Sequence, residues 1–301
     1  MKRNQAIFLL VLTTIIWGMG VVAQIAGMDY IHPFALNVHR SLAAGLFLLV
    51  VLLFFPKLRD VGTDLKATIQ GGICCGICLS VAMALQQYGL QFTTAGKAGF
   101  ITALYIVLVP IGGILLHHAI SKKTWLAVAI AAVGLYFISI QKGAGFSMGR
   151  GEFLIFLCAI AFTVHILVID HFADRVDGVA MSCIQFFTAA VISFFFVLPT
   201  GASLFGDCAK ALPAILYLGI LSSGVGFTLQ IMGQRHTDPT TASLILSLES
   251  VFSLLGGLLI LKESMTLREG LGSLLLFVAI LIAQLPVENF LKSAKEKSAK
   301  N

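Results

Sequence analysis

Long apolar segments separated by short polar breaks follow one another along nearly the whole chain. A helix needs about 20 mostly apolar residues to cross the roughly 30 Å of hydrocarbon in a lipid bilayer. Charged and turn-forming residues divide this chain into about ten such segments. We expect transmembrane helices at 6–27, 33–55, 68–90, 96–117, 123–141, 151–169, 178–198, 211–234, 240–261 and 267–286.

The stretches between these segments are short. The longest of them, 56–67, 141–150 and 199–210, are too small to hold a soluble domain. Composition agrees, because 58% of the residues are hydrophobic and 11% are charged, against about 25% charged in an average soluble domain. We therefore expect an all-α integral membrane protein whose function lies within or between its helices.

The chain resembles itself. When it is shifted by 144 residues without gaps, residues 81–116 superpose on 225–260 with 12 identities in 36 positions. Biased composition alone would supply roughly three or four. The excess indicates a duplication into two five-helix units, which we place at 5–141 and 150–286. Because five is odd, the second unit must cross the membrane in the opposite sense, as an inverted repeat.

Inverted repeats favour a transporter, because two similar halves can exchange conformations around a shared site. A channel usually needs a pore with selectivity rings, and no repeated acidic, basic or carbonyl-filter motif is visible. A facilitative channel, or a membrane receptor or assembly subunit that binds without transporting, remains an alternative.

The basic residues predict the orientation, since Lys and Arg are retained on the cytoplasmic side during insertion. With the N-terminus inside, 13 of the 20 Lys and Arg fall in cytoplasmic segments and five in outside segments. We therefore expect both termini in the cytoplasm, with 287–301 as a basic tail attracted to the membrane surface. Met1–Ala23 could instead be a cleaved secretory signal, but cleavage would leave nine spans and break the repeat.

Ionisable groups inside a bilayer are costly and usually face the bundle interior, a partner or water. Arg40 could tie helix ends and loop carbonyls together, or contact an anionic substrate group. Glu249 lies near the middle of the ninth segment, where it could carry a coupling proton, bind a substrate ammonium or play a structural part. The 144-residue shift places it opposite Tyr105, so we expect both near the repeat axis.

Other polar side chains within the segments are further cavity candidates. Gln86 and Gln230 are related by the repeat and could gate or bind on opposite sides, or hold helices together. Lys97 could meet an anion or simply reach water. His165 could also face the cavity, and Trp17 could form part of its wall.

Several motifs are better explained by packing than by chemistry. Cys75 and Cys78 have CxxC spacing, but no His or carboxylate accompanies them, and their glycine-rich surroundings suit close helix approach. The paired glycines lack the context of a phosphate loop. No catalytic constellation is visible, and the basic residues lie between apolar runs. We therefore expect no enzyme activity, cofactor, metal or nucleic-acid partner.

Four stretches resemble the drug/metabolite transporter superfamily, specifically its EamA-type proteins. They are WGMG at 17–20, NVHRSLAAGLFL around Arg40, YGLQFTTAGKAGFITALYIVLVP at 88–110 and HTDPTTASLILSLESVFSLLGGLLILKES at 236–264. Family members often have a proline after the glutamate of helix 9, where this chain has Ser250. The proline-type kink of that helix is therefore not expected.

The resemblance implies a ten-helix bundle of two inverted five-helix halves in a bacterial inner membrane, with both termini cytoplasmic. It implies export of small metabolites, amino acids or drug-like compounds by alternating access. The expected partners are then the lipid bilayer, a small-molecule substrate and a proton if transport is coupled to one. Cargo differs widely within the family, so the resemblance does not name the substrate.

Overall fold

The computed structural model describes residues 3–56, 63–115, 121–139, 149–264 and 266–284, and all regular structure in these ranges is helical. The first half contains α1 (Arg3–Met28), α2 (Pro33–Phe54), α3 (Leu65–Gly89), η2 (Leu90–Phe92), α4 (Ala95–Thr102), α5 (Tyr105–Leu115) and α6 (Lys122–Ser139). The second half contains α7 (Arg150–Phe172), α8 (Gly178–Val197), η3 (Leu198–Thr200), α9 (Cys208–Leu216), η4 (Tyr217–Phe227), α10 (Thr228–Gln234), α11 (Pro239–Leu246), α12 (Glu249–Leu259) and α13 (Leu267–Gln284).

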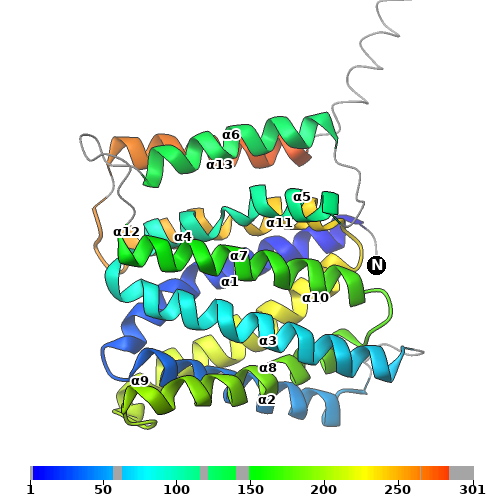
Figure 1. Ribbon diagram of the computed structural model, residues 1–301, viewed down its shortest axis with the longest axis vertical. Coiled ribbons are helices and arrows are strands. Elements are labelled where there is room, and N and C mark those ends of the chain that lie inside the picture. Colours follow the sequence, from blue (N-terminus) through cyan, green and yellow to red (C-terminus); the bar gives the residue numbers. More distant parts are fainter. Residues whose placement is uncertain (1–2, 57–62, 116–120, 140–148, 265, 285–301) are drawn as a thin grey trace, which may run out of the picture.

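Within the described residues, eight helical segments are long and apolar enough to cross a membrane. Two shorter apolar helices, 125–134 in α6 and 270–279 in α13, lie at the places of the fifth and tenth predicted segments. These two helices pack side by side at one edge of the bundle (Figure 1). The all-α membrane fold expected from the sequence is therefore confirmed.

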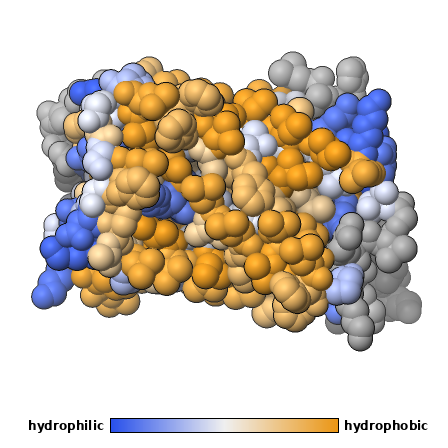
Figure 2. Space-filling view, turned by 90° about the horizontal axis from the view of Figure 1, so that it is seen from below, coloured by the Kyte–Doolittle hydropathy of each residue, from blue (hydrophilic) through white to orange (hydrophobic). Residues whose placement is uncertain are grey.

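The surface agrees with a bilayer environment. Figure 2 shows a broad apolar face with hydrophilic residues gathered at its two ends. Figure 1 shows α2 and α8 at the lower edge of the bundle, and the exposed apolar side chains of these two helices include Leu46, Val50, Val191 and Phe195. Such a surface would be costly in water, whereas lipid chains solvate it. The helix ends, where charged residues interrupt the apolar runs, meet the aqueous sides.

The two halves repeat the same broken helix. α4 and α5 become α11 and α12 when 144 is added to both bounds of each element. Figure 1 shows α4 beside α12 at one end of the bundle and α5 beside α11 at the other. The two broken helices therefore run in opposite directions, and the halves are inverted. α1 begins and α13 ends at the same end of the bundle, as an inverted pair of five-helix units requires.

A break in the ninth segment occurs without the proline that family members often carry. α11 ends at Leu246 and α12 begins at Glu249, and the turn between them closes with an N–H···O bond from Leu248 to Ile245 of 3.0 Å. The Ser247 and Ser250 hydroxyls each donate to the carbonyl three residues earlier, at 2.7 Å. Serine hydroxyls that bond back to the chain bend helices, and here they accompany the break.

Small residues let α3 approach α8 closely, as the glycine-rich stretch around the cysteines predicts. A Cβ atom added to Gly72 would lie 2.6 Å from the Ile184 Cβ, and one added to Gly76 would lie 2.5 Å from the Thr188 Cβ. Both distances are shorter than van der Waals contact, so only glycine fits. All six cysteines of the chain are free thiols.

Candidate functional site

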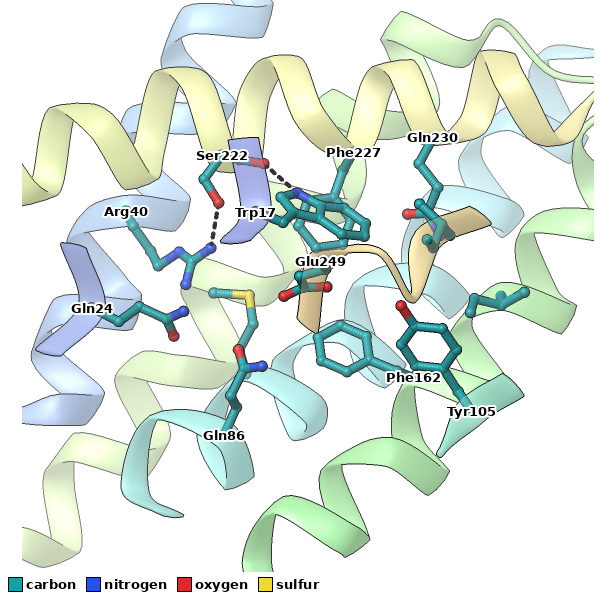
Figure 3. A pocket seen from close by; sticks show the side chains of 13 residues that line it. Trp17, Gln24, Arg40, Gln86, Tyr105, Phe162, Ser222, Phe227, Gln230 and Glu249 are labelled. Atoms are coloured by element: carbon teal, nitrogen blue, oxygen red, sulfur yellow. Dashed lines mark hydrogen bonds between the residues drawn. The ribbon is translucent and has the colours of Figure 1, made fainter. Parts of the chain in front are cut away.

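Residues of both halves line one cavity, whose empty space is about 480 Å³ including the part open to solvent. Figure 3 shows its side chains converging from helices far apart in the sequence. The lining residues are Trp17, Gln24, Arg40, Met83, Gln86, Tyr105, Phe162, Ile166, Ser222, Phe227, Gln230, Leu246 and Glu249.

Arg40 reaches the cavity from α2 and is 3% exposed. Its Nε donates to the Ser223 Oγ at 3.2 Å, and its Nη2 donates to the Ser222 Oγ at 3.4 Å. Its Nη1 is buried and has no hydrogen-bond partner. An unmade hydrogen bond of a buried donor costs about 1–3 kcal/mol or more. The guanidinium is therefore held by two serines and keeps donor capacity for an accepting group in the cavity.

The two serines belong to η4, an 11-residue π-helical stretch between α9 and α10. π-helical turns are rare in proteins, and those that occur are often found at functional sites. The same stretch fixes the indole of Trp17, whose Nε1 donates to the Ser222 carbonyl oxygen at 2.9 Å. η4 thus positions both the cation and one aromatic wall of the cavity.

Glu249 is the first residue of α12, directly after the break in the second broken helix. It is 9% exposed, and Figure 3 places its carboxylate between Arg40 on one side and Tyr105 on the other. Within the described residues, Glu249 and Arg40 do not form a direct ion pair. Opposite charges buried in a low-dielectric cavity are costly without partners. The arrangement therefore suits a ligand that carries both a negative and a positive group.

Tyr105 and Gln230 line the cavity on the side of Glu249 away from Arg40 (Figure 3). Tyr105 begins α5, so it occupies the same place in the first broken helix as Glu249 does in the second. The Tyr105 hydroxyl and the Gln230 Oε1 are buried without a hydrogen-bond partner. This side of the cavity therefore offers neutral hydrogen-bonding groups.

Aromatic rings form much of the remaining wall. The rings of Trp17 and Phe227 lie 4.4 Å apart between centroids, and Phe162 lines the cavity from α7. With Met83 and Leu246 they give the cavity an apolar lining around its polar groups. A ligand with a small apolar body and separate charged ends would meet both kinds of surface.

Six of the eight residues expected from the sequence line this cavity, and two do not. Lys97 lies near the start of α4, in a smaller pocket of about 270 Å³ that it shares with Glu263. His165 is fully buried behind the wall, with its Nε2 3.2 Å from the Gln185 Oε1 and its ring edge-to-face with Phe227 at 5.7 Å.

Seven lining residues were not anticipated: Gln24, Met83, Phe162, Ile166, Ser222, Phe227 and Leu246. Most are apolar residues in apolar helices, where nothing in a single sequence distinguishes a cavity wall from a lipid-facing or core position. Gln24 is different, because an amide inside a predicted span carries the same signal as Gln86 and Gln230.

Two inverted helical halves that enclose a cavity with buried charged residues have the architecture of a membrane transporter. The comparisons agree. The chain belongs to the EamA-like transporter family, whose model matches residues 4–140 and 149–284. It is therefore a multi-pass membrane protein of a transporter family within the drug/metabolite transporter superfamily, for which small-molecule substrates are expected.

An uncharacterized transporter from Archaeoglobus fulgidus is 31% identical over 287 residues, which cover 95% of this chain and 88% of the relative. A protein from Streptantibioticus cattleyicolor, named a probable terminal-alkyne amino-acid exporter, is 24% identical over 238 residues, or 75% of each chain. A protein of known crystal structure matches with a TM-score of 0.73 at 17% identity and covers 96% of this chain and 99% of its own. That structural match shows a shared fold.

Proposed function

We propose that the protein is a secondary transporter that exports small zwitterionic molecules, with amino acids as the first candidates, by alternating access. The observation that carries the proposal is the pair of buried opposite charges in one cavity, Arg40 and Glu249, which face the cavity without pairing directly. The guanidinium would bind the substrate carboxylate, and Glu249 would bind its ammonium. The Arg40 Nη1, which is buried without a hydrogen-bond partner, would then gain one.

The substrate class also fits the relatives. The protein from Streptantibioticus cattleyicolor that is 24% identical to this chain carries a name that specifies amino-acid export. Export rather than uptake is the direction that this name supports.

The inverted halves supply the mechanism. We assign one unit to 5–141 and the other to 150–286, and rocking of one against the other would open the cavity first to one side and then to the other. The distribution of Lys and Arg supports cytoplasmic termini. The connections between spans on the same side of the membrane as the N-terminus contain basic residues, among them Lys66, Lys122, Arg175 and Arg235. A bacterial inner membrane is the location that the family resemblance supports.

Glu249 would also couple transport to a proton. A carboxylate that binds an ammonium in one conformation and a proton in the return conformation links the two fluxes, because both ligands neutralise the same buried charge. Arg40, which stays cationic, would keep the carboxylate site in both conformations. In this scheme Glu249→Gln abolishes coupling while leaving the helix bundle intact.

Counterflow in proteoliposomes tests the proposal. Vesicles loaded with an unlabelled mixture of L-amino acids are diluted into a trace of the labelled mixture, and transient accumulation of label marks a carrier. The wild type should show this overshoot, and Glu249→Gln should show none at any pH between 5 and 8. Entry of label without overshoot would indicate a facilitative channel. Binding without entry would indicate a receptor, and an unchanged overshoot in Glu249→Gln would remove the ammonium-binding role of Glu249.

A further inference from the structure

We propose that Tyr105 and Gln230 form a side-chain subsite that selects zwitterions whose side chain carries a hydroxyl or another small neutral hydrogen-bonding group. The inference rests on the proposed function and specifies its substrate class further. It begins from the position of the two residues, which lie across Glu249 from Arg40 with their polar ends pointing toward one another (Figure 3).

Gln230 is held in one orientation by its neighbours. Its Nε2 donates to the Gln234 Oε1 at 2.8 Å, and the Gln234 Nε2 in turn donates to the Ile166 carbonyl oxygen at 3.1 Å. Gln230 is 1% exposed, and its Oε1 has no hydrogen-bond partner. The network therefore uses the amide donor and leaves an acceptor in the cavity.

Tyr105 supplies the complementary group. The side chain is 3% exposed, and its hydroxyl is buried without a partner. A phenol can donate one hydrogen bond and accept others. A ligand hydroxyl placed between the two residues could donate to the Gln230 Oε1 and accept from the Tyr105 hydroxyl. Such a ligand group would satisfy both buried atoms at once.

The charges of the cavity exclude other occupants of this subsite. Arg40 and Glu249 are the cation and the carboxylate among the lining residues, and both are needed for the zwitterionic part of the substrate. Neither Tyr105 nor Gln230 offers a full charge at neutral pH, so a charged side chain would lose water without gaining a counter-charge. An apolar side chain would leave both atoms unpaired.

The size of the preference follows from the unpaired groups. A site built to hydrogen-bond a substrate hydroxyl discriminates against the analogue without it, because its own buried polar groups then stay unsatisfied. Each unsatisfied group costs about 1–3 kcal/mol, and about 1.4 kcal/mol corresponds to a tenfold change in affinity. We expect L-threonine to bind at least about tenfold more tightly than L-valine, which has a methyl group in place of the hydroxyl.

The test measures the affinities of L-threonine and L-valine, and of L-asparagine and L-leucine as a second isosteric pair, by calorimetric titration of the purified full chain. In Tyr105→Phe the threonine-to-valine ratio should fall below about threefold, because threonine loses a hydrogen-bond partner and valine no longer leaves the phenol hydroxyl unpaired. Gln230→Met provides a second variant with the same expectation. Tyr217→Phe is the matched control, because it removes a hydroxyl that donates to the Ile16 carbonyl oxygen outside the cavity lining.

Valine binding as tightly as threonine, or a ratio that survives both variants, would overturn the subsite while leaving the zwitterion proposal in place. Failure of all four amino acids to bind would overturn the proposed substrate class itself, and the subsite with it. The two failures are therefore distinguishable in one set of titrations.

Discussion

The two broken helices have the same backbone and different chemistry. The second part of each begins with a residue that lines the cavity, Tyr105 in α5 and Glu249 in α12. One copy offers a neutral hydroxyl and the other a carboxylate. Duplication thus preserved the geometry that brings both residues to the cavity. The two side chains diverged, so that Tyr105 is neutral and Glu249 is a carboxylate.

The start of each broken helix differs as well. The N–H groups of Ala95 and Gly96, the first two residues of α4, donate to the carboxylate of Glu263 in the other half. The N···O distances are 3.0 Å from Ala95 and 3.5 Å from Gly96. α11 begins with Pro239, which has no N–H group, and its Asp238 accepts from the Thr241 N–H at 2.8 Å. α4 also has a cap within its own half, because the Thr94 hydroxyl accepts from the Lys97 N–H at 3.3 Å. Both helix starts are therefore capped locally, and α4 is in addition tied across the two halves.

The largest effect should come from the charged member of the central pair. Glu249→Gln removes the charge that faces the substrate ammonium, and hydrogen bonds to charged groups are worth about 1.5–3 kcal/mol. We expect exchange of L-threonine to fall by about 100-fold in Glu249→Gln, whereas Tyr105→Phe, which removes one neutral hydrogen bond, should lower it by about tenfold or less. Initial rates of exchange measure both. Equal losses of exchange rate in the two variants would show that Tyr105 and Glu249 have the same role.

Arg40→Lys should have a smaller effect, because it keeps the positive charge and loses the planar guanidinium with its several hydrogen-bond donors. A lysine cannot donate to Ser222 and Ser223 and to a ligand carboxylate with the same fixed geometry. We expect amino-acid affinity to fall by about tenfold in calorimetric titration, with the variant still monodisperse. Wild-type affinity in this variant would mean that Arg40 acts at a distance rather than by direct contact.

Removal of the cap at each of the two helix starts should lower the stability of the protein by different amounts. Glu263→Ala removes a cap that also joins the halves, and we expect it to lower the free energy of unfolding by about 1–2 kcal/mol. Asp238→Ala removes a local cap and should cost about 1 kcal/mol or less. Denaturant unfolding in detergent compares them. Asp207→Asn serves as the control, because it removes the exposed charge pair with Lys210 while asparagine keeps the side-chain oxygen that caps α9.

The smallest effect is expected from Ser250→Pro, which restores the residue common in the family. Ser250 is the second residue of α12, where proline is tolerated because first-turn N–H groups have no partner four residues earlier. The substitution removes two bonds to the Ser247 carbonyl oxygen, one from the Ser250 N–H and one from the Ser250 hydroxyl. We expect a change below about 1 kcal/mol and full exchange activity. Loss of activity would mean that the serine hydroxyls, and not the break alone, are required.

Much of the fold could be predicted from the sequence, because the bilayer forces each span to be long, apolar and helical. The repeat could be predicted too, since Tyr105 and Glu249 occupy equivalent positions in the shifted alignment. The break at Ser247 and Leu248 could not, because it depends on local hydrogen bonds that leave no mark as clear as proline.

The candidate site was predictable where a polar side chain is costly in lipid, as for Arg40, Gln86 and Gln230. It was not predictable where the rotation of a helix about its axis decides whether a side chain faces the cavity. His165 and Trp17 both lie in apolar helices, yet Trp17 lines the cavity and His165 bonds to Gln185 behind its wall. The π-helical stretch that brings Ser222 to Arg40 has no recognisable sequence pattern.

Recognition of both charges of a zwitterion by one cavity can be measured directly by titrating the purified protein with L-threonine, with 3-hydroxybutyrate, which lacks the ammonium, and with 1-amino-2-propanol, which lacks the carboxylate. If Arg40 and Glu249 bind the two charged ends, each truncated compound should bind at least tenfold more weakly than threonine. Equal affinity for threonine and either truncated compound would contradict recognition by this pair.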